Sequence, residues 1–256
     1  MGGYELRQRI RAGEFNGQTS GQCPGYQQAN VVILPASSAD DFLRYCVSNP
    51  KPCPILAVGE PGQAKLTQLG HDVDIRRDIP AYRVFRHGEA VASCDNIMDL
   101  WQSDFVAFVL GCSFSFEAAL QRAGITIGHI AAQRNVPMYI TQIPTQAAGS
   151  FSGPLVVSMR AFNPAQAIRA IVLSERYPHA HGAPVHIGDP TAIGIADIHQ
   201  PDFGDPPVLQ DGDIAVFWAC GVTPQLALRQ AAPALAITHQ PGHMLITDLP
   251  TDGTIT

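Results

Sequence analysis

The chain has 256 residues, of which 46% are hydrophobic and 15% charged, and its formal net charge is −6. This length is sufficient for a large buried core in one or two domains. The acidic balance and the lack of any lysine or arginine cluster argue against nucleic acid as a partner. No window reaches the ~18 apolar residues that span a bilayer, which argues against a membrane partner. The N-terminal sequence MGGYELRQRIRAGEF also lacks the apolar stretch of a signal peptide.

The cysteine pattern argues against both a disulfide scaffold and a zinc site. Six cysteines are scattered along the chain, at Cys23, Cys46, Cys53, Cys94, Cys112 and Cys220. None of them forms a CxxC pair, and their density is far below that of small disulfide-rich proteins. We therefore expect reduced thiols and a cytoplasmic location. We predict no cofactor, with a divalent metal as the open alternative.

In chain order, the first half alternates between helical and strand patterns. A short helix in LRQRIRAG precedes a glycine-punctuated loop and the apolar strand NVVILP. The amphipathic helix SSADDFLRYCVSNP follows, then a strand in PCPILAVGEPG and a hairpin in AYRVFRHGEAVA with its turn at His87–Gly88. Strands that alternate with helices favour a mostly parallel sheet between two helical layers.

Residues 125–187 show a different pattern. Short strand candidates lie in ITIGHIAA, PMYITQIP and PLVVSMRAF, and a helix capped by Asn163 leads to a further strand in HGAPVHIG. The fold class that we predict is α/β, in which a smaller two-layer α/β domain of residues 125–187 is inserted into a parent domain. That parent, residues 1–124 and 188–256, is predicted as a three-layer α/β/α domain with a mostly parallel sheet.

A thiol follows a buried strand and precedes a helix at two places. The first strand ends at Gly111 and leads into Cys112, Ser113 and Ser115; the second runs over 214–219 and leads into Cys220. Free N–H groups and the dipole at a helix N-terminus favour negative charge, so thiolate or anion chemistry is indicated. The alternative interpretation is a small buried hydrophobe beside a capped helix. Thr223 followed by proline explains the second helix start by capping alone.

Three further groups have chemistry of interest. Glu117 lies in the first helical turn without the S-x-x-E capping box, since Phe114 stands three residues before it. An acid/base or binding role is therefore open beside simple complementation of the helix dipole. The loop with Thr19 and Ser20 carries glycines that let backbone N–H groups approach a carboxylate, although it is not a P-loop. Arg160 could bind a carboxylate bidentately, and a surface ion pair is the alternative.

Histidines gather late in the chain, in HAHGAPVHIGDP and THQPGH. Their intrinsic pKa suits a general base. The odd spacing of His181 and His186 places them on opposite sides of a strand, which argues against a metal site formed by these two. Our candidate catalytic residues are Cys112, Glu117, Cys220, His181 and His243. Our candidate substrate-binding residues are Thr19, Ser20, Ser113, Ser115, Arg160 and Thr223, and we predict no metal ligand.

Several long motifs resemble the D-glutamate cyclase family. They include GEFNGQTSGQCPGYQQANVVILP, DIRRDIPAYRV, GCSFSFEAAL, GPLVVSMR, FWACGVTPQ and THQPGHMLITDL, and the resemblance runs from about residue 6 to residue 249. It implies an α/β fold of two domains and a hydro-lyase that dehydrates D-glutamate to 5-oxo-D-proline. The expected partner is a small-molecule carboxylate, and a homodimer stays open. Two other classes fit the residues: a racemase with two thiols, and a carboxylate-binding protein without catalysis.

Overall fold

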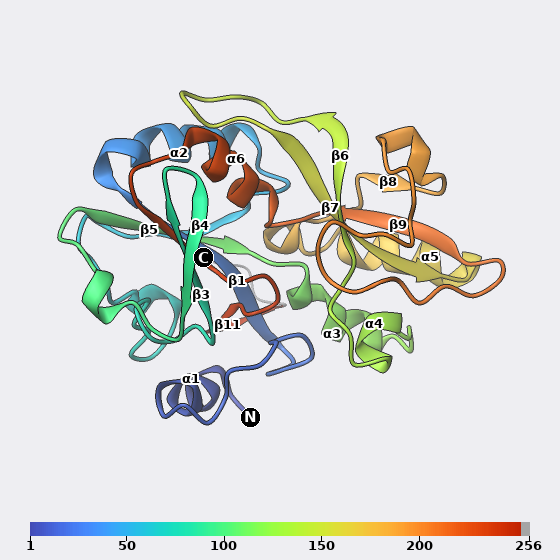
Figure 1. Ribbon diagram of the computed structural model, residues 1–256. Helices are drawn as coiled ribbons and strands as arrows, with labels where there is room; N and C mark the ends of the chain where they lie inside the picture. The colour runs from blue at the N-terminus through green and yellow to red at the C-terminus, as the bar shows by residue number, and fades with distance from the viewer. Residues whose placement is uncertain (252–256) are drawn as a thin grey trace.

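The structure, a computed structural model, describes residues 1–251 and contains two sheets that lie side by side (Figure 1). The first sheet has the order β2-β5-β1-β10-β3-β4, and β11 also pairs with β1. Its strands are β1 (Tyr26–Pro35), β2 (Ile55–Val58), β3 (Tyr82–Arg86), β4 (Glu89–Cys94), β5 (Phe105–Gly111), β10 (Ala236–His239) and β11 (Leu245–Pro250). The second sheet, β6-β7-β9-β8, consists of β6 (Met138–Pro144), β7 (Pro154–Phe162), β8 (His186–Ile187) and β9 (Ile214–Ala219).

Six α-helices accompany these sheets in the described residues. They are α1 (Gly3–Arg11), α2 (Ala36–Ser48), α3 (Phe114–Arg122), α4 (Gly128–Ala131), α5 (Pro164–Ser174) and α6 (Thr223–Ala231). Short 3₁₀ helices include Pro178–Ala180, which precedes His181. Within residues 1–251, no helix has the length and apolar character needed to cross a membrane.

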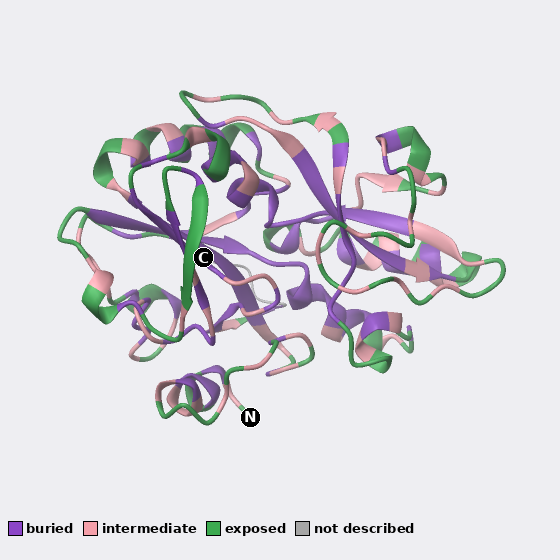
Figure 2. Cartoon of the chain, in the orientation of Figure 1, coloured by how far each residue is buried: buried purple, intermediate pink, exposed green. Residues whose placement is uncertain are grey.

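The first sheet is buried on both faces, and its side chains alternate between two apolar cores. Val31 and Ile33 of β1 belong to one core, whereas Val32 and Leu34 pack with α2 and α6 in the other. This alternation follows from the two-residue period of a strand, applied to a run that is apolar at every position. Figure 2 shows the central strands as buried and the edge strand β4 as mostly exposed.

The prediction of a mostly parallel three-layer sheet was wrong, because every strand pair in both sheets is antiparallel. Strand β2, which follows α2, does run parallel to β1. The two strands are not neighbours, because β5 lies between them and pairs antiparallel with each. The units β5–α3 and β9–α6 leave their sheet altogether, whereas α5 stays on the second sheet and leads to β8 and β9, which run antiparallel to one another. Local alternation of strands and helices therefore did not determine which strands became neighbours.

The two strand–Cys–helix turns are the places where the chain passes from one sheet to the other. After β5, helix α3 packs Phe116 and Leu120 with Trp218 of the second sheet. After β9, helix α6 returns and packs Ala227 and Leu228 against the first sheet. The predicted inserted unit of 125–187 supplies β6, β7 and α5, and the same sheet also takes β9 from beyond it. Its predicted boundaries stay a prediction.

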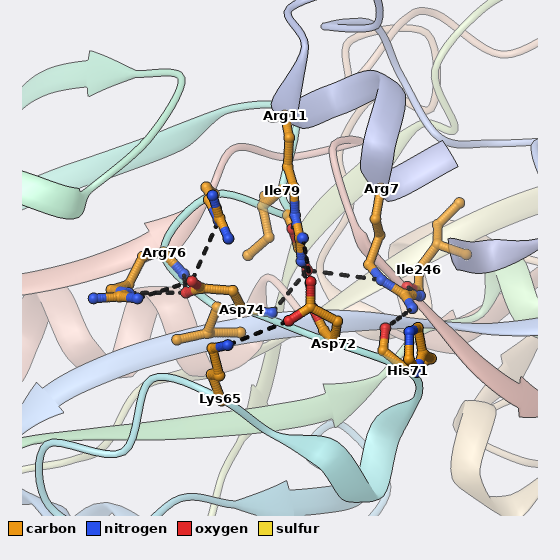
Figure 3. A network of polar contacts seen from close by, with 12 residues as sticks. Arg7, Arg11, Lys65, His71, Asp72, Asp74, Arg76, Ile79 and Ile246 are labelled. Atoms are coloured by element: carbon orange, nitrogen blue, oxygen red, sulfur yellow. Dashed lines mark hydrogen bonds and ion pairs between the residues drawn. The ribbon is translucent and has the colours of Figure 1, made fainter. Parts of the chain in front are cut away.

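Helix α1 is held to the first sheet by a buried ion-pair network (Figure 3). The fully buried Arg7 donates to the carbonyls of Ile246 and His71 at 2.7 and 2.9 Å, and to both carboxylate oxygens of Asp248. One turn later, Arg11 binds both oxygens of the buried Asp78. The DIRRDIP motif therefore has a structural role, since its second aspartate anchors the N-terminal helix.

Arg7→Met is expected to lower the free energy of unfolding by about 3–5 kcal/mol, because it breaks the ion pair of the fully buried Arg7 with Asp248 and leaves two backbone carbonyls without their donor. The measurement is urea denaturation. Arg9→Met is the matched control: Arg9 is on the same helix, and its exposed pair with Glu14 at 3.7 Å should contribute less than about 1 kcal/mol. Equal losses in the two variants would contradict the structural role of Arg7.

Candidate active site

The two strand–Cys–helix turns are built in the same way. In the first, Ser115 accepts a hydrogen bond from Gln28 N at 2.9 Å and donates to Gln28 O at 3.3 Å. Gln28 lies one residue beyond the last pair of the β1–β5 ladder, Ala29 with Gly111, as does Cys112. Ser115 N also donates to Cys112 O, which closes a tight turn at 3.0 Å. The serine hydroxyl thus attaches the start of α3 to the neighbouring strand.

The second turn repeats this arrangement. Thr223 accepts from Val156 N at 2.9 Å and donates to Val156 O at 3.2 Å. The register places Val156 opposite Cys220, and Thr223 N donates to Cys220 O at 3.0 Å. In both turns, the hydroxyl three residues after the cysteine binds the backbone that the cysteine faces. Ser115 and Thr223 are therefore structural residues, and our prediction that they bind substrate has no geometric support.

The two cysteines belong to the same buried cluster between the sheets, with Met138 and Val156 among its members. Burial raises the pKa of the Cys112 thiol to about 12, although hydrogen bonding from the N–H of Phe114 opposes it. Burial also raises the pKa of Cys220 to about 11, against opposing backbone donors at its own turn. Both thiols are therefore protonated near neutral pH, which favours proton donation over nucleophilic attack.

Glu117 and Arg160 form a buried ion pair beside these turns. Arg160 donates to Glu117 Oε1 through Nε at 3.0 Å and through Nη2 at 2.5 Å. His129 Nε2 lies 3.2 Å from the same oxygen, and Ser20 donates to the other oxygen at 3.4 Å. Burial opposes ionisation of Glu117, but the nearby Arg160 and His129 outweigh it and lower its pKa to about 2. Glu117 is a permanent carboxylate, so the structure does not support a role as an acid.

Arg160 has further partners that fix its position. It donates to Ser158 and Ser113 hydroxyls at 3.1 Å each. Its guanidinium also lies over the rings of Phe116 and Trp218, 5.1 and 5.4 Å from their centroids. Such contacts stabilise a buried cation. Ser113 joins the arginine to the first turn, and its role in binding substrate stays a prediction.

His181 is buried and adjoins this cluster through the 3₁₀ helix that contacts β5 and α3. Its Nδ1 is 2.8 Å from the carbonyl of Lys51, so Nδ1 carries the proton and Nε2 is the free acceptor. Nε2 has no hydrogen-bond partner among the described residues. Burial lowers the pKa of His181 to about 4, and Arg160 acts in the same direction. The imidazole is neutral at pH 7, and the residue adopts a left-handed backbone, φ +76°.

Two predicted site residues lie apart from the charged cluster and hold a turn. Thr19 donates to the carbonyl of Gly242 at 3.2 Å and accepts from Met244 N at 3.0 Å. His243 Nδ1 lies 3.1 Å from the carbonyl of Pro241 in the same β10–β11 turn. These contacts join the glycine-rich loop to that turn. They give neither residue a chemical task.

Both cysteine turns lie in a segment that is shared with a known family. A family model described as D-glutamate cyclase matches residues 106–248, which include the two turns. A relative from Verminephrobacter eiseniae is 58% identical over 245 residues, 96% of this chain and 89% of its own; one from Bordetella petrii is 56% identical over 246 residues, 96% and 93%. Both are described as “Putative hydro-lyase”. The chain belongs to the D-glutamate cyclase family.

The likeness to a solved structure is weak. A nitrogen repressor-like protein MJ0159 from Methanococcus jannaschii covers 99% of each chain with a TM-score of 0.41 and 9% identity. A likeness of this degree supports no inference about fold or function.

Sequence reasoning missed two residues of the site in this family member. Asn30, buried in β1, donates to the carbonyl of Gly111 at 2.7 Å. A Cβ on Gly221 would collide with the Asn30 side chain, so Asn30 contacts both cysteine turns. His129, beside Glu117, was also missed. The available signal for Asn30 was its position as the last polar residue before the apolar run VVIL.

No group of three or more histidine, cysteine, aspartate or glutamate side chains in the described part of the chain is arranged to hold an ion. His181 and His186 are also held by different backbone carbonyls, those of Lys51 and Asp189.

His181 predicts a specific pH dependence of stability. Since its pKa is about 4 when folded and near 6.5 when unfolded, the unfolded chain alone takes up the proton between these values. The contribution of the neutral His181 to the free energy of unfolding is complete above about pH 6.5. It is lost as the pH falls toward 4, at up to about 1.4 kcal/mol per pH unit. The free energy of unfolding is measured by urea denaturation at pH 7 and at pH 4.5. Its decrease between these pH values should be smaller in His181→Asn than in the wild-type protein, by about 2–3 kcal/mol.

Asparagine is chosen for this test because it tolerates the left-handed backbone at position 181. The matched control is His199→Asn, since His199 is exposed. The buried His239, whose pKa burial also lowers to about 4, leaves a residual pH dependence in both variants. An unchanged pH dependence in His181→Asn would show that this imidazole is not held neutral.

Proposed function

We propose that the protein is a hydro-lyase that closes a glutamate-type amino-dicarboxylate into its lactam, 5-oxoproline, with loss of water. The family description and the hydro-lyase names of the relatives support this reaction class. The observation that carries the proposal is the meeting of two cysteine turns, Arg160 and a neutral His181 around one buried junction. Buried charges and shifted pKa values concentrated in one place are typical of a functional site.

Binding of a dicarboxylate calls for positive potential at the junction. The guanidinium of Arg160 supplies a formal charge, and the starts of α3 and α6 supply the positive ends of their helix dipoles. Because α3 and α6 begin at Phe114 and Thr223, directly after the two turns, both helix starts face the same interface. Their dipoles would stabilise the oxygen charge that develops on the attacked carboxyl group.

The reaction itself is a rearrangement of protons around one new bond. The α-amine nitrogen attacks the γ-carboxyl carbon, and the C–O bond of the tetrahedral intermediate breaks. Of the three ammonium protons, one stays on the lactam nitrogen and two leave with the oxygen as water. The neutral His181 Nε2 can accept the first proton, although a pKa of about 4 makes it a weak base in the free protein. The protonated Cys112 and Cys220 are suitable donors to the departing oxygen, which is far more basic than either thiolate.

The decisive test follows the interconversion of D-glutamate and 5-oxo-D-proline by chiral chromatography, with and without a divalent metal. The wild-type protein should convert at least one of the two compounds. Cys112→Ala and His181→Asn should each lower turnover about 100-fold or more, since each removes a proton-transfer group. Cys94→Ala is the control, because Cys94 lies on the edge strand β4 outside the junction.

Two results would contradict this proposal. Failure of the wild-type protein to convert either compound under all conditions would exclude the lyase. Thermal stabilisation by these ligands without turnover would instead support the carboxylate-binding alternative.

A racemase that uses two thiols is the second candidate, and the equivalent construction of the two cysteine turns favours it. One cysteine, as its thiolate, would remove the α-proton, and the other, as a thiol, would return a proton to the opposite face. The expected result is exchange of the α-hydrogen of glutamate or 5-oxoproline with solvent deuterium, followed by NMR, and loss of this exchange in Cys112→Ser and Cys220→Ser. Absence of exchange in the wild-type protein would eliminate the racemase.

A further inference from the structure

A small hollow of about 10 Å³, large enough for one water-sized group, lies between the glycine-rich loop and α3, next to the charged cluster. Backbone of residues 21–25 forms one wall, and Gln28, Ser115 and Glu117 line the other parts. It adjoins the junction described above, because Glu117 is common to both. A role for this hollow in recognising the substrate therefore rests on the proposed function.

Gln28 presents an unpartnered acceptor in this hollow. Its amide nitrogen donates to the carbonyls of Thr19 and Gln22 at 2.9 and 3.2 Å. This fixes the orientation of the amide, since a flip would turn its oxygen against two carbonyl oxygens. The oxygen Oε1 is buried and has no hydrogen-bond partner within residues 1–251. A buried acceptor without a donor costs about 1–3 kcal/mol, so a donor from a ligand would be strongly favoured here.

Glu117 adds a charged acceptor to the same place. Its Oε1 is engaged by Arg160, whereas Oε2 has a single long hydrogen bond, 3.4 Å from Ser20, among the described residues. A carboxylate oxygen can accept further hydrogen bonds. The hollow thus combines an amide oxygen and a carboxylate oxygen, with the Ser20 hydroxyl beside them.

We propose that this hollow binds the amino group of the substrate, with Gln28 Oε1 and Glu117 Oε2 each accepting one of its N–H bonds. At these two acceptors the ligand must supply a donor, because a carboxylate in this position would place oxygen against oxygen. The ligand class is therefore a primary ammonium or amine on a small carboxylic acid. Such a site distinguishes an amino acid from the corresponding acid without nitrogen.

The test compares the dissociation constants of D-glutamate and glutarate, which differ only in the amino group, by isothermal titration calorimetry. Wild-type protein should bind D-glutamate more tightly than glutarate. Gln28→Met should reduce the preference for D-glutamate over glutarate about tenfold, because it removes the acceptor for the amino group. A general loosening of the loop would weaken the binding of both ligands alike and leave this preference unchanged. Binding of 5-oxo-D-proline, which has no ammonium group, should change less than binding of D-glutamate.

Gln27→Met is the matched control. Gln27 is the neighbouring residue of β1, is equally buried, and its side chain donates to the carbonyl of Pro250 instead. It should leave the glutamate-to-glutarate ratio at the wild-type value. An equal ratio in Gln28→Met and Gln27→Met would overturn the inference, and the hollow would then hold a water molecule only.

The remaining outcomes separate this inference from the proposed function. Equal affinity of the wild-type protein for D-glutamate and glutarate, together with lyase turnover, would overturn the amino-group site and leave the hydro-lyase standing. Absence of binding by D-glutamate, glutarate and 5-oxo-D-proline would overturn both. A reduced ratio of the two dissociation constants in Gln28→Met supports the amino-group site, whether or not the protein shows lyase turnover.

Discussion

The paired hydrogen bonds of Ser115 with Gln28 and of Thr223 with Val156 are the contacts on which the rest of the architecture depends. Each pair fixes the start of a helix to a neighbouring strand at the point where the cysteine ends its own strand. The helix then packs on, or leads to, the opposite sheet. Because α3 packs on the second sheet and α6 on the first, the two sheets exchange helices rather than simply meet. This exchange brings both cysteines to one interface and fixes the positions of the helix starts that face it.

The charged groups lie where this exchange creates an interior between the sheets. Arg160 comes from β7 and Glu117 from α3, so their ion pair joins the second sheet to the crossing helix. A buried pair of this kind is weak evidence for stability, since desolvation offsets much of the attraction. The more informative features are the unsatisfied acceptors around it, His181 Nε2 and Gln28 Oε1. A fold optimised for stability alone would fill or pair them. Their presence supports a site shaped for ligand groups.

Sequence patterns predicted the local elements well and their relations poorly. The apolar runs 105–111 and 214–219 and the helices after them were identifiable because strand and helix periodicity are local properties. Strand direction was not, because β5 joins β1 across some seventy intervening residues. The backbone partners of Ser115 and Thr223 could not be predicted, since the sequence does not tell whether a hydroxyl at a helix start caps its own helix, bonds a neighbouring strand or binds a ligand. The partner of Glu117 lies 43 residues away at Arg160 and could not be inferred from spacing.

The central claim is that the junction between the two cysteine turns binds the substrate. A crystal structure of the protein with D-glutamate or 5-oxo-D-proline tests it most directly. We predict ligand density between Cys112 and Cys220, with a carboxylate near Arg160 and the amino group or ring nitrogen toward Gln28. Density for the ligand at another place, with this junction filled only by protein side chains, would contradict the claim.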